Sequence, residues 1–432
     1  MTTLASVVSC LSDYDPNALP VETAQAIMRG FVQPVSGFAR VPIRSALDRV
    51  LAEDILSSID VPSHDNSAMD GFAFSSAELA RGEGEIALRV IGTAYAGVAF
   101  DGAPSAGEAV RIMTGAVMPA GCDTVIPQEF TQGTDDDCTT VRFARDAVRA
   151  GDNRRLRGED LARGSAALSA GRILRPADIG LLASLGVAEV SVRRKLRVAF
   201  FSTGDELRSI GEPLDAGCVY DSNRYTLHGM LSRLGVELLD MGVVRDDPAA
   251  LEAAFRTAAE NADAIITSGG VSVGEADFTK QMMAKLGDVT FWKIAMRPGR
   301  PMAFGRISSN GPDGHGAFLF GLPGNPVAVM VTFYHFVRGA LLRMMGATES
   351  GAPLVPAVSA TPIRKRPGRT EYQRAIAALN DRGQLEVRLT GQQGSGVLRS
   401  MSEANCFVVL AHEQGQVNAG DAVQALLFDG LV

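Results

Sequence analysis

The sequence is poor in cysteine and lacks the spacings with which cysteine and histidine bind zinc. Its 432 residues include only five cysteines and five histidines, and neither CxxC nor HExxH occurs. Neither a disulfide framework nor a zinc site is therefore expected, and the composition fits a reducing cytoplasm. His335, in the segment FYHFV, is predicted to pack within a helix rather than to bind a ligand.

Basic residues are outnumbered by acidic ones, 41 to 49, which gives a net charge of -8. This balance argues against general binding of nucleic acid or of an anionic membrane surface. The hydrophobic share of 46% and the charged share of 21% are ordinary for a soluble globular protein. The chain is too long for one core, so two to four domains are expected.

Targeting and membrane signals are also missing. No basic residue precedes Arg29, so a secretory signal peptide is not expected. Residues 316–337 form an uncharged apolar run, but GLPGNP interrupts it. The run is therefore predicted to be a buried strand, a tight turn and a buried helix, and no membrane span is expected.

The segment TSGGVSVGEADFTK resembles a phosphate-binding loop but departs from the known nucleotide motifs. Gly269 and Gly274 have the spacing of the outer glycines of a P-loop, yet Glu275 and Ala276 stand where Lys and Ser/Thr are needed. No GxGxxG follows a predicted strand either. The segment is therefore no ATPase loop and no ordinary dinucleotide site; a tight turn and a loop that binds phosphate both remain open.

From Lys195 to about Met345, strand and helix patterns alternate, which predicts a doubly wound α/β domain with a largely parallel sheet. Ser222 is predicted to cap one helix, and Asp247 with Pro248 to begin the next. Five loops follow strand ends, the edge where α/β sheets bind ligands: STGDEL, RDD, TSGGVSVGEAD, MRPGRP and GLPGNP.

The flanking regions are predicted to form further domains. Residues 1–194 begin with an amphipathic helix, VETAQAIMRGF, and carry a β-rich insertion at about 60–165. The α/β domain covers 195–348. Residues 352–432 contain short strand patterns, which predict a small β-barrel or sandwich.

Carboxylates gather at the predicted ligand-binding edge: Asp205, Glu206, Asp246, Asp247, Glu275 and Asp277. They would repel one another unless a divalent cation lies between them, and ligands that are all oxygen suit Mg²⁺. Asp247 is better explained as a helix cap. Lys293, Arg297 and Arg300 can neutralise an anion. The pattern therefore predicts a phosphate ester or pyrophosphate bound with its metal.

Weaker signals lie elsewhere in the chain. Asp70 lies in a loop that mixes apolar and polar residues, PSHDNSAMDGFAF, and Thr114 is predicted to lie at the tip of a β-turn. RRLRGED suits either anion binding or salt bridges between chains. Arg374 and Ser395, in RTEYQRA and GQQGSG, can bind a small oxyanion, although a hairpin turn explains them equally.

Eight segments together resemble the MoeA-type molybdopterin molybdenumtransferases, the molybdenum insertases, and are similar to the E domain of gephyrin. In chain order they are NSAMDGFA, RIMTGA, RRLRGED, STGDEL, YDSNRY, TSGGVSVGEADFTK, RPGRPMAFG and GLPGNPVA. The resemblance runs from about Arg40 to the C-terminus. It implies that molybdate, adenylylated molybdopterin and Mg²⁺ are used, that the pyrophosphate is cleaved with release of AMP, and that molybdenum is placed on the dithiolene.

The same resemblance implies a cytoplasmic homodimer with an active site between the central domain of one subunit and the N-terminal domain of the other. Transient contacts with molybdopterin adenylyltransferase and with apo-molybdoenzymes are also implied. Residue by residue, it assigns catalysis to Asp70, Thr114, Glu206, Asp246 and Asp277, of which the last three would hold Mg²⁺. It assigns substrate binding to Gly269, Gly270, Ser272, Gly274, Glu275, Lys293, Arg297, Arg155, Asp160, Pro323 and Pro326, and molybdate binding to Arg374 and Ser395.

One residue departs from the family pattern: Arg297 stands where many members have Lys, which keeps the charge but changes the geometry. Two other functions remain alternatives. A molybdopterin adenylyltransferase would share the glycine-loop domain alone, which the additional domains argue against. A non-catalytic scaffold would have no use for the set of clustered acids.

Overall fold

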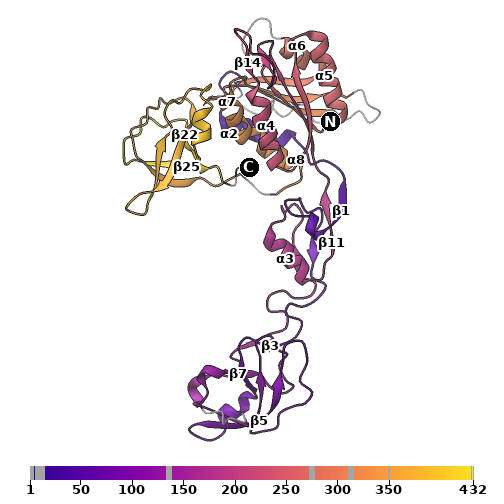
Figure 1. The fold of residues 1–432 in the computed structure, drawn as a ribbon, viewed down its shortest axis with the longest axis vertical. Helices are drawn as coiled ribbons and strands as arrows, with labels where there is room; N and C mark the ends of the chain where they lie inside the picture. Colours follow the sequence, from indigo (N-terminus) through magenta and orange to yellow (C-terminus); the bar gives the residue numbers. More distant parts are fainter. Residues whose placement is uncertain are drawn as a thin grey trace. The chain divides into compact units, whose positions relative to one another are not determined.

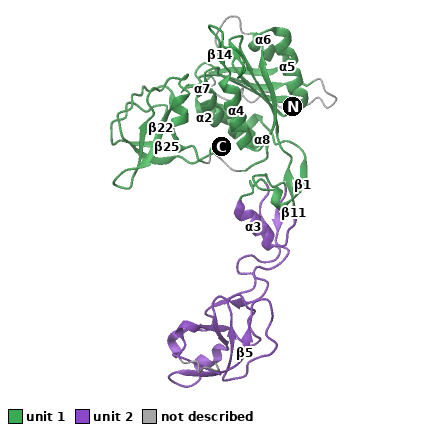
Figure 2. Ribbon diagram, viewed as in Figure 1, with its two compact units in different colours: residues 1–52, 171–175, 190–432 green, residues 53–170, 176–189 purple. Residues whose placement is uncertain are grey.

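The computed structural model describes residues 15–132, 139–271, 278–309, 316–348 and 351–429, together with Leu4 and Leu431. These residues form two compact units (Figure 2). One unit comprises residues 1–52, 171–175 and 190–432, and the other comprises residues 53–170 and 176–189.

A six-stranded sheet forms the centre of the larger unit, in the order β15-β12-β16-β20-β19-β17. Its strands are β12 (Arg197–Thr203), β15 (Glu237–Val244), β16 (Ala264–Ser268), β17 (Gly287–Lys293), β19 (Pro301–Ile307) and β20 (Ala317–Leu322). β12, β15, β16 and β20 pair in parallel, whereas β19 is antiparallel to both of its neighbours. The predicted, largely parallel sheet is therefore confirmed.

Helices cover both faces of this sheet. Successive side chains of a strand point to opposite sides, and the apolar side chains on each side need a layer of helices to bury them. Val198 and Phe200 of β12 belong to one hydrophobic core, whereas Ala199 and Phe201 belong to another. The first core includes residues of α4 (Ser222–Arg233) and α7 (Pro326–Thr332); the second includes residues of α5 (Pro248–Asn261) and α6 (Phe278–Leu286). This arrangement confirms the doubly wound fold.

The two helix starts differ in how well the sequence predicted them. Asp247 caps α5 by accepting a hydrogen bond from the Ala250 amide at 2.9 Å, and Pro248 is the first helical residue, as predicted. The prediction for α4 was wrong: its cap is Asp221, whose Oδ1 accepts from the Arg224 amide at 3.1 Å. The same oxygen accepts from the Ser202 hydroxyl at 3.0 Å. Asp221 therefore ties the start of the helix to the end of β12, a link that local sequence cannot reveal.

The uncharged apolar run forms β20, a turn and α7, as predicted. The helix continues through a π-helical turn at Phe333–Val337 into α8 (Arg338–Met344). Pro326–Met344 is long and apolar enough to cross a membrane, but 67% of its apolar window is buried inside the protein, as in a core helix. The ring of His335 stacks on Tyr372, with 3.7 Å between ring centroids, which confirms its predicted packing role.

The predicted amphipathic helix is α2 (Val21–Phe31). It contributes to the same core as β12 and α7, and the Phe31 ring packs edge-on against Phe304 at 5.6 Å between centroids.

The C-terminal strands close into a barrel, in the order β22-β23-β21-β25-β24 and back to β22. Figure 1 labels two of these strands, β22 and β25. Its elements are β21 (Val355–Ser359), β22 (Thr370–Leu379), β23 (Leu385–Leu389), α9 (Arg399–Glu403), β24 (Cys406–Leu410) and β25 (Ala422–Leu427). A further strand, β18 (Met296–Arg297), pairs with β22 in parallel. The barrel thus contacts the MRPGRP loop of the α/β sheet directly.

The smaller unit is β-rich, as predicted for its sequence. Its five-stranded sheet has the order β7-β4-β6-β5-β8. The strands are β4 (Gly71–Phe74), β5 (Ile86–Ala94), β6 (Glu108–Ile112), β7 (Thr124–Pro127) and β8 (Thr140–Phe143); helix α3 (Pro176–Ser184) also belongs to this unit.

Short two-stranded sheets occur in both units. Their strands pair as follows: β1 (Phe38–Pro42) with β11 (Glu189–Arg193), β2 (Ile55–Leu56) with β10 (Ala166–Leu168), β3 (Asn66–Ser67) with β9 (Arg154–Arg155), and β13 (Leu207–Arg208) with β14 (Val219–Tyr220).

Candidate active site

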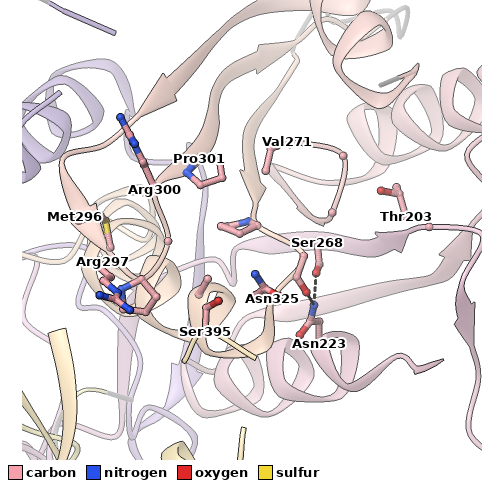
Figure 3. A pocket seen from close by; sticks show the side chains of 18 of the residues that line it. Thr203, Asn223, Ser268, Val271, Met296, Arg297, Arg300, Pro301, Asn325 and Ser395 are labelled. Atoms are coloured by element: carbon pink, nitrogen blue, oxygen red, sulfur yellow. Dashed lines mark hydrogen bonds between the residues drawn. The ribbon is translucent and has the colours of Figure 1, made fainter. Parts of the chain in front are cut away.

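Loops at the carboxyl edge of the α/β sheet, together with a loop of the barrel, surround a cavity of about 890 Å³ (Figure 3). β17 runs parallel to β20, because β19 between them is antiparallel to both, so the five predicted loops do meet at one edge. Of the residues predicted for the site, eight line the cavity: Glu206, Asp246, Gly269, Gly270, Arg297, Arg300, Pro323 and Ser395.

The acidic side of the cavity is formed by Glu206, after β12, and Asp246, after β15. Burial raises the pKa of Asp246 above its ordinary value, and the charges of Asp205 and Glu206 raise it further. The Asp246 amide donates to Asp205 Oδ1 at 3.4 Å, and the Thr279 hydroxyl donates to Asp246 Oδ1 at 3.4 Å. Carboxylates that disfavour one another's ionisation in this way create a favourable place for a cation.

This carboxylate pair fits a magnesium ion that is shared with a phosphorylated substrate. In the described part of the chain, no group of three or more His, Cys, Asp or Glu residues is placed to hold a metal. Mg²⁺, however, is usually held by one or two carboxylates plus phosphate oxygens, rather than by a cage made of protein alone. Glu206 and Asp246 supply such a pair, whereas Asp247 is engaged as the cap of α5.

The glycine loop begins with two residues that have positive φ angles, Gly269 at +95° and Gly270 at +68°. A Cβ on Gly269 would lie 2.5 Å from the carbonyl oxygen of Thr203, and one on Gly270 would collide with Thr279. The Gly269 amide donates to the Leu322 carbonyl at 3.1 Å, so it helps to hold the sheet edge together. Further residues predicted in this loop lie outside the described residues: Ser272, Gly274, Glu275 and Asp277.

Polar residues that sequence reasoning missed form one wall of the cavity (Figure 3). The Asn223 side chain donates from Nδ2 to Ser268 Oγ at 2.8 Å and to the Gly324 carbonyl at 2.6 Å. Its Oδ1 atom is buried and finds no hydrogen-bond partner among the described residues. Asn223 lies in the segment YDSNRY, in the first turn of α4. Because this segment follows the end of a strand, its position could have indicated a residue of the site.

The basic side of the cavity is lined by Arg297, Arg300 and Arg369, next to Gln393 and Ser395. Figure 3 shows Arg297 and Ser395 on the same side of the cavity, away from Thr203. Arg369 was not predicted from the sequence. The cavity therefore carries carboxylates at one side and guanidinium groups at the other.

Arg374 lies just outside this lining and is almost fully buried. Its guanidinium donates to Ser400 Oγ and to three carbonyl oxygens of the loop that leads to Ser395: those of Gln392, Gln393 and Gly394. Burial, with the charge of Arg297, lowers the pKa of Arg374 to about 10, so the group remains charged near neutral pH. In this structure it shapes the loop, and its role towards molybdate stays a prediction.

Two more predicted residues lie next to the cavity without lining it. The main chain of Lys293 bonds to the N-terminal segment, since its amide donates to the Pro16 carbonyl at 2.7 Å. Pro326 is the first residue of α7, where its fixed φ angle and missing amide hydrogen are well tolerated.

Four predicted residues belong to the smaller unit. The Asp70 carboxylate accepts two hydrogen bonds at Oδ1, from the Thr114 amide at 2.6 Å and from the Thr114 hydroxyl at 2.7 Å. These bonds hold the pKa of Asp70 below its ordinary value. Arg155 pairs with Asn66 between β9 and β3, and the Asp160 amide donates to the Val61 carbonyl at 3.1 Å. The structure thus brings Asp70 and Thr114 together, as a fixed, ionised carboxylate beside a hydroxyl.

Three family models match the chain in order and cover most of it. They are described as the MoeA N-terminal region (domain I and II), over residues 19–186, a "probable molybdopterin binding domain", over 199–343, and the MoeA C-terminal region (domain IV), over 356–428.

Relatives and solved structures agree with these models. The chain is 43% identical over 391 residues to the molybdopterin molybdenumtransferase of Haemophilus influenzae, covering 90% of this chain and 94% of that protein. It is 34% identical to the enzyme of the same name from a Nostoc species, covering 89% and 88%. The crystal structure of a molybdopterin biosynthesis MoeA protein from Pyrococcus horikoshii superposes with a TM-score of 0.78 at 27% identity, covering 95% of this chain and all of that one. The chain therefore belongs to the MoeA family of molybdopterin molybdenumtransferases, which are enzymes of molybdenum cofactor biosynthesis.

Proposed function

We propose that this chain inserts molybdenum from molybdate into adenylylated molybdopterin, with Mg²⁺-dependent cleavage of the pyrophosphate bond and release of AMP. The observation that carries this proposal is the division of the cavity into a carboxylate side and a guanidinium side. A ligand with a metal-bound pyrophosphate and a separate oxyanion matches both sides, whereas a simple phosphate ester leaves one side without a partner.

On the acidic side, Glu206 and Asp246 would hold Mg²⁺, with Asp277 proposed as a third ligand. Held there, the ion would supply positive charge to offset that of the pyrophosphate and of the departing AMP. The buried Asn223 Oδ1 and the Ser268 hydroxyl provide polar contacts close to the start of the glycine loop. Asp70 and Thr114 are proposed to complete the site, with Asp70 as an ionised group.

On the basic side, Arg297 and Ser395 are proposed to bind molybdate. Arg297 replaces the lysine of many relatives; since a guanidinium keeps its proton, this residue binds and orients but does not act as an acid. Lys293, Arg155 and Asp160 are proposed to contact the pterin or its phosphate, and Pro323 and Pro326 to shape the turn below it.

At the level of the whole protein, we propose a homodimer in the cytoplasm. Each active site would combine the larger unit of one subunit with the smaller unit of the other. The product would pass to apo-molybdoenzymes, and the substrate would come from molybdopterin adenylyltransferase. The expected domain boundaries at about 194 and 350 stay a prediction.

The test is an anaerobic incubation of the purified protein with adenylylated molybdopterin, Mg²⁺ and molybdate. AMP release is followed by chromatography, and the cofactor by reconstitution of an apo-molybdoenzyme. We expect AMP release to require both molybdate and Mg²⁺. Tight binding without AMP release would identify a scaffold, and formation of adenylylated molybdopterin from ATP would identify an adenylyltransferase.

Two neighbouring aspartates provide a matched pair of variants for this assay. Asp246→Asn should abolish AMP release, because it removes a carboxylate from the acidic side of the cavity. Asp247→Asn should keep it, because Asn caps a helix about as well as Asp. Equal activity in the two variants would contradict the assigned role of Asp246.

A further inference from the structure

Ser268, the last residue of β16, has a hydroxyl hydrogen whose direction is set by its neighbour Asn223. Asn223 Nδ2 donates to Ser268 Oγ at 2.8 Å (Figure 3) and to the Gly324 carbonyl oxygen at 2.6 Å. A carbonyl oxygen can only accept, so the amide nitrogen of Asn223 has to face Gly324, and Ser268 Oγ is the acceptor of the second bond. The Ser268 hydroxyl hydrogen therefore points away from Asn223.

An acceptor for this hydrogen is expected in the cavity. Ser268 is 2% exposed and belongs to the cavity wall, and within the described ranges of the chain its hydroxyl donates to no protein atom. A buried donor without an acceptor is costly. There is room for a ligand here, since the nearest atom to a Cβ added on Gly324, outside its chain neighbours, is the Gly269 Cα at 4.0 Å.

Ser202 shows the opposite arrangement one strand away. It lies beside Ser268 in the register of β12 and β16, and it is 1% exposed. Its hydroxyl donates to Asp221 Oδ1 at 3.0 Å, and Ser202 does not line the cavity. Of two neighbouring buried serines, one thus uses its hydrogen inside the protein, and the other presents its hydrogen to the cavity.

The chemistry of the cavity indicates which acceptor suits Ser268. The carboxylates of the acidic side, Glu206 and Asp246, repel phosphate oxygens unless a metal lies between them. A serine hydroxyl is a neutral donor, and its bond to an anionic oxygen is about twice as strong as one between neutral groups. Gly269 and Gly270, which follow Ser268 and also line the cavity, carry no side chain that would keep a phosphate away.

We infer that Ser268 contacts the substrate, with its hydroxyl donating to an anionic oxygen of the pyrophosphate group, and that Asn223 is its positioning residue. Asn223 turns the hydroxyl hydrogen towards the cavity, and its bond to Gly324 ties the start of the glycine loop to the GLPGNP turn. The inference rests on the proposed function for the identity of the pyrophosphate, and on the hydrogen-bond geometry for the two residues.

The direct test measures the binding of inorganic pyrophosphate to the full chain by isothermal titration calorimetry, with Mg²⁺ in excess. Ser268→Ala should weaken binding about tenfold or more, because it removes a hydrogen bond to a charged group. Ser202→Ala is the matched control: it removes an equally buried hydroxyl from the neighbouring strand, and it should bind within about twofold of the wild type. Equal affinities of the two variants would overturn the inference, as would a wild type that binds no pyrophosphate.

The positioning role of Asn223 is tested by a double-mutant cycle on the same binding constant. In Asn223→Asp, the carboxylate accepts the hydrogen of Ser268 and so turns it away from the cavity, while its charge also repels the ligand. Only the first effect needs Ser268. Asn223→Asp should therefore weaken binding about tenfold more in the wild-type background than in the Ser268→Ala background. Equal effects in both backgrounds would refute the positioning role. Asn223→Leu, which is neutral and cannot donate, repeats the cycle should Asn223→Asp fail to fold.

The contact and the proposed function fail in different ways. Molybdate-dependent AMP release by Ser268→Ala, with an unchanged KM for adenylylated molybdopterin, would leave the proposed function intact and refute the contact. Pyrophosphate binding that depends on Ser268, in a protein that releases no AMP, would support the contact and refute the proposed function.

Discussion

Replacing Gly269 with alanine should damage the sheet edge at the point where the glycine loop begins. Gly269 has a φ angle of +95°, and an added Cβ would lie 2.5 Å from the Thr203 carbonyl oxygen. The left-handed backbone costs an L-residue about 1–2 kcal/mol. Overpacking against a main-chain atom costs about 1–3 kcal/mol more. We therefore expect Gly269→Ala to lower the free energy of unfolding by about 2–5 kcal/mol.

The two contributions can be separated with a second glycine. Gly211 has a φ angle of +90°, but no heavy atom lies within 4 Å of its added Cβ. Gly211→Ala should therefore show the backbone cost alone, about 1–2 kcal/mol. The single tryptophan, Trp292, is buried in β17 of the same sheet. Its fluorescence during urea unfolding reports on the α/β domain, which limits interference from the other parts of the chain.

Activity provides a second readout of the same pair. Gly269→Ala should also lose molybdate-dependent AMP release, because the end of β12 and the start of the glycine loop must separate to admit the methyl group. Gly211→Ala should remain active. If both variants lost equal stability within about 0.5 kcal/mol, the predicted collision with Thr203 would be refuted.

Three further predictions address the rest of the chain. Asp70→Asn should abolish AMP release with little change in melting temperature, since Asp70 is exposed; full activity would remove it from the site. Burial lowers the pKa of His335 to about 3, so between pH 7 and 5 the unfolded chain takes up a proton that the folded chain does not. The free energy of unfolding should therefore fall by at most about 2 kcal/mol between pH 7 and pH 5. His335→Gln should reduce this fall, which urea titrations at the two pH values would measure. The same fall in the variant as in the wild type would contradict the prediction. Arg194 donates to both oxygens of Asp263, at 2.8 and 2.7 Å. Asp263→Ala should therefore cost about 1–3 kcal/mol, whereas Glu403→Ala, which breaks an exposed pair, should cost under about 0.5 kcal/mol in the same unfolding measurement.

The α/β architecture could be predicted from the sequence because its signals are local. Continuous apolar runs such as that of β12 mark strands that are buried on both faces, and Asp247-Pro248 marks a helix start. Parallel strands then place their following loops at one edge by topology alone. For this reason Glu206 and Asp246, which are far apart in sequence, were expected in one site, and both line the cavity.

Predictions that depended on contacts between distant segments were less complete. Ser222 looked like a helix cap, but Asp221 takes that position: its carboxylate accepts from the Arg224 amide and also from Ser202, near the end of β12. Asn223 was missed because its importance comes from contacts with Ser268, the last residue of β16, and with Gly324, in the GLPGNP loop.

The sequence by itself determined the family, the doubly wound sheet and the acidic loops at its edge, since periodicity and motif order encode these features. Only the tertiary structure decided which basic residues face the cavity. Arg369 and Arg374 are five residues apart, yet among the described residues Arg369 donates a hydrogen bond only from Nε, whereas Arg374 is enclosed by carbonyl oxygens. That difference arises because Ser400 of α9 and the loop at residues 392–394 surround the Arg374 guanidinium, and this packing of distant segments is specified by no local pattern.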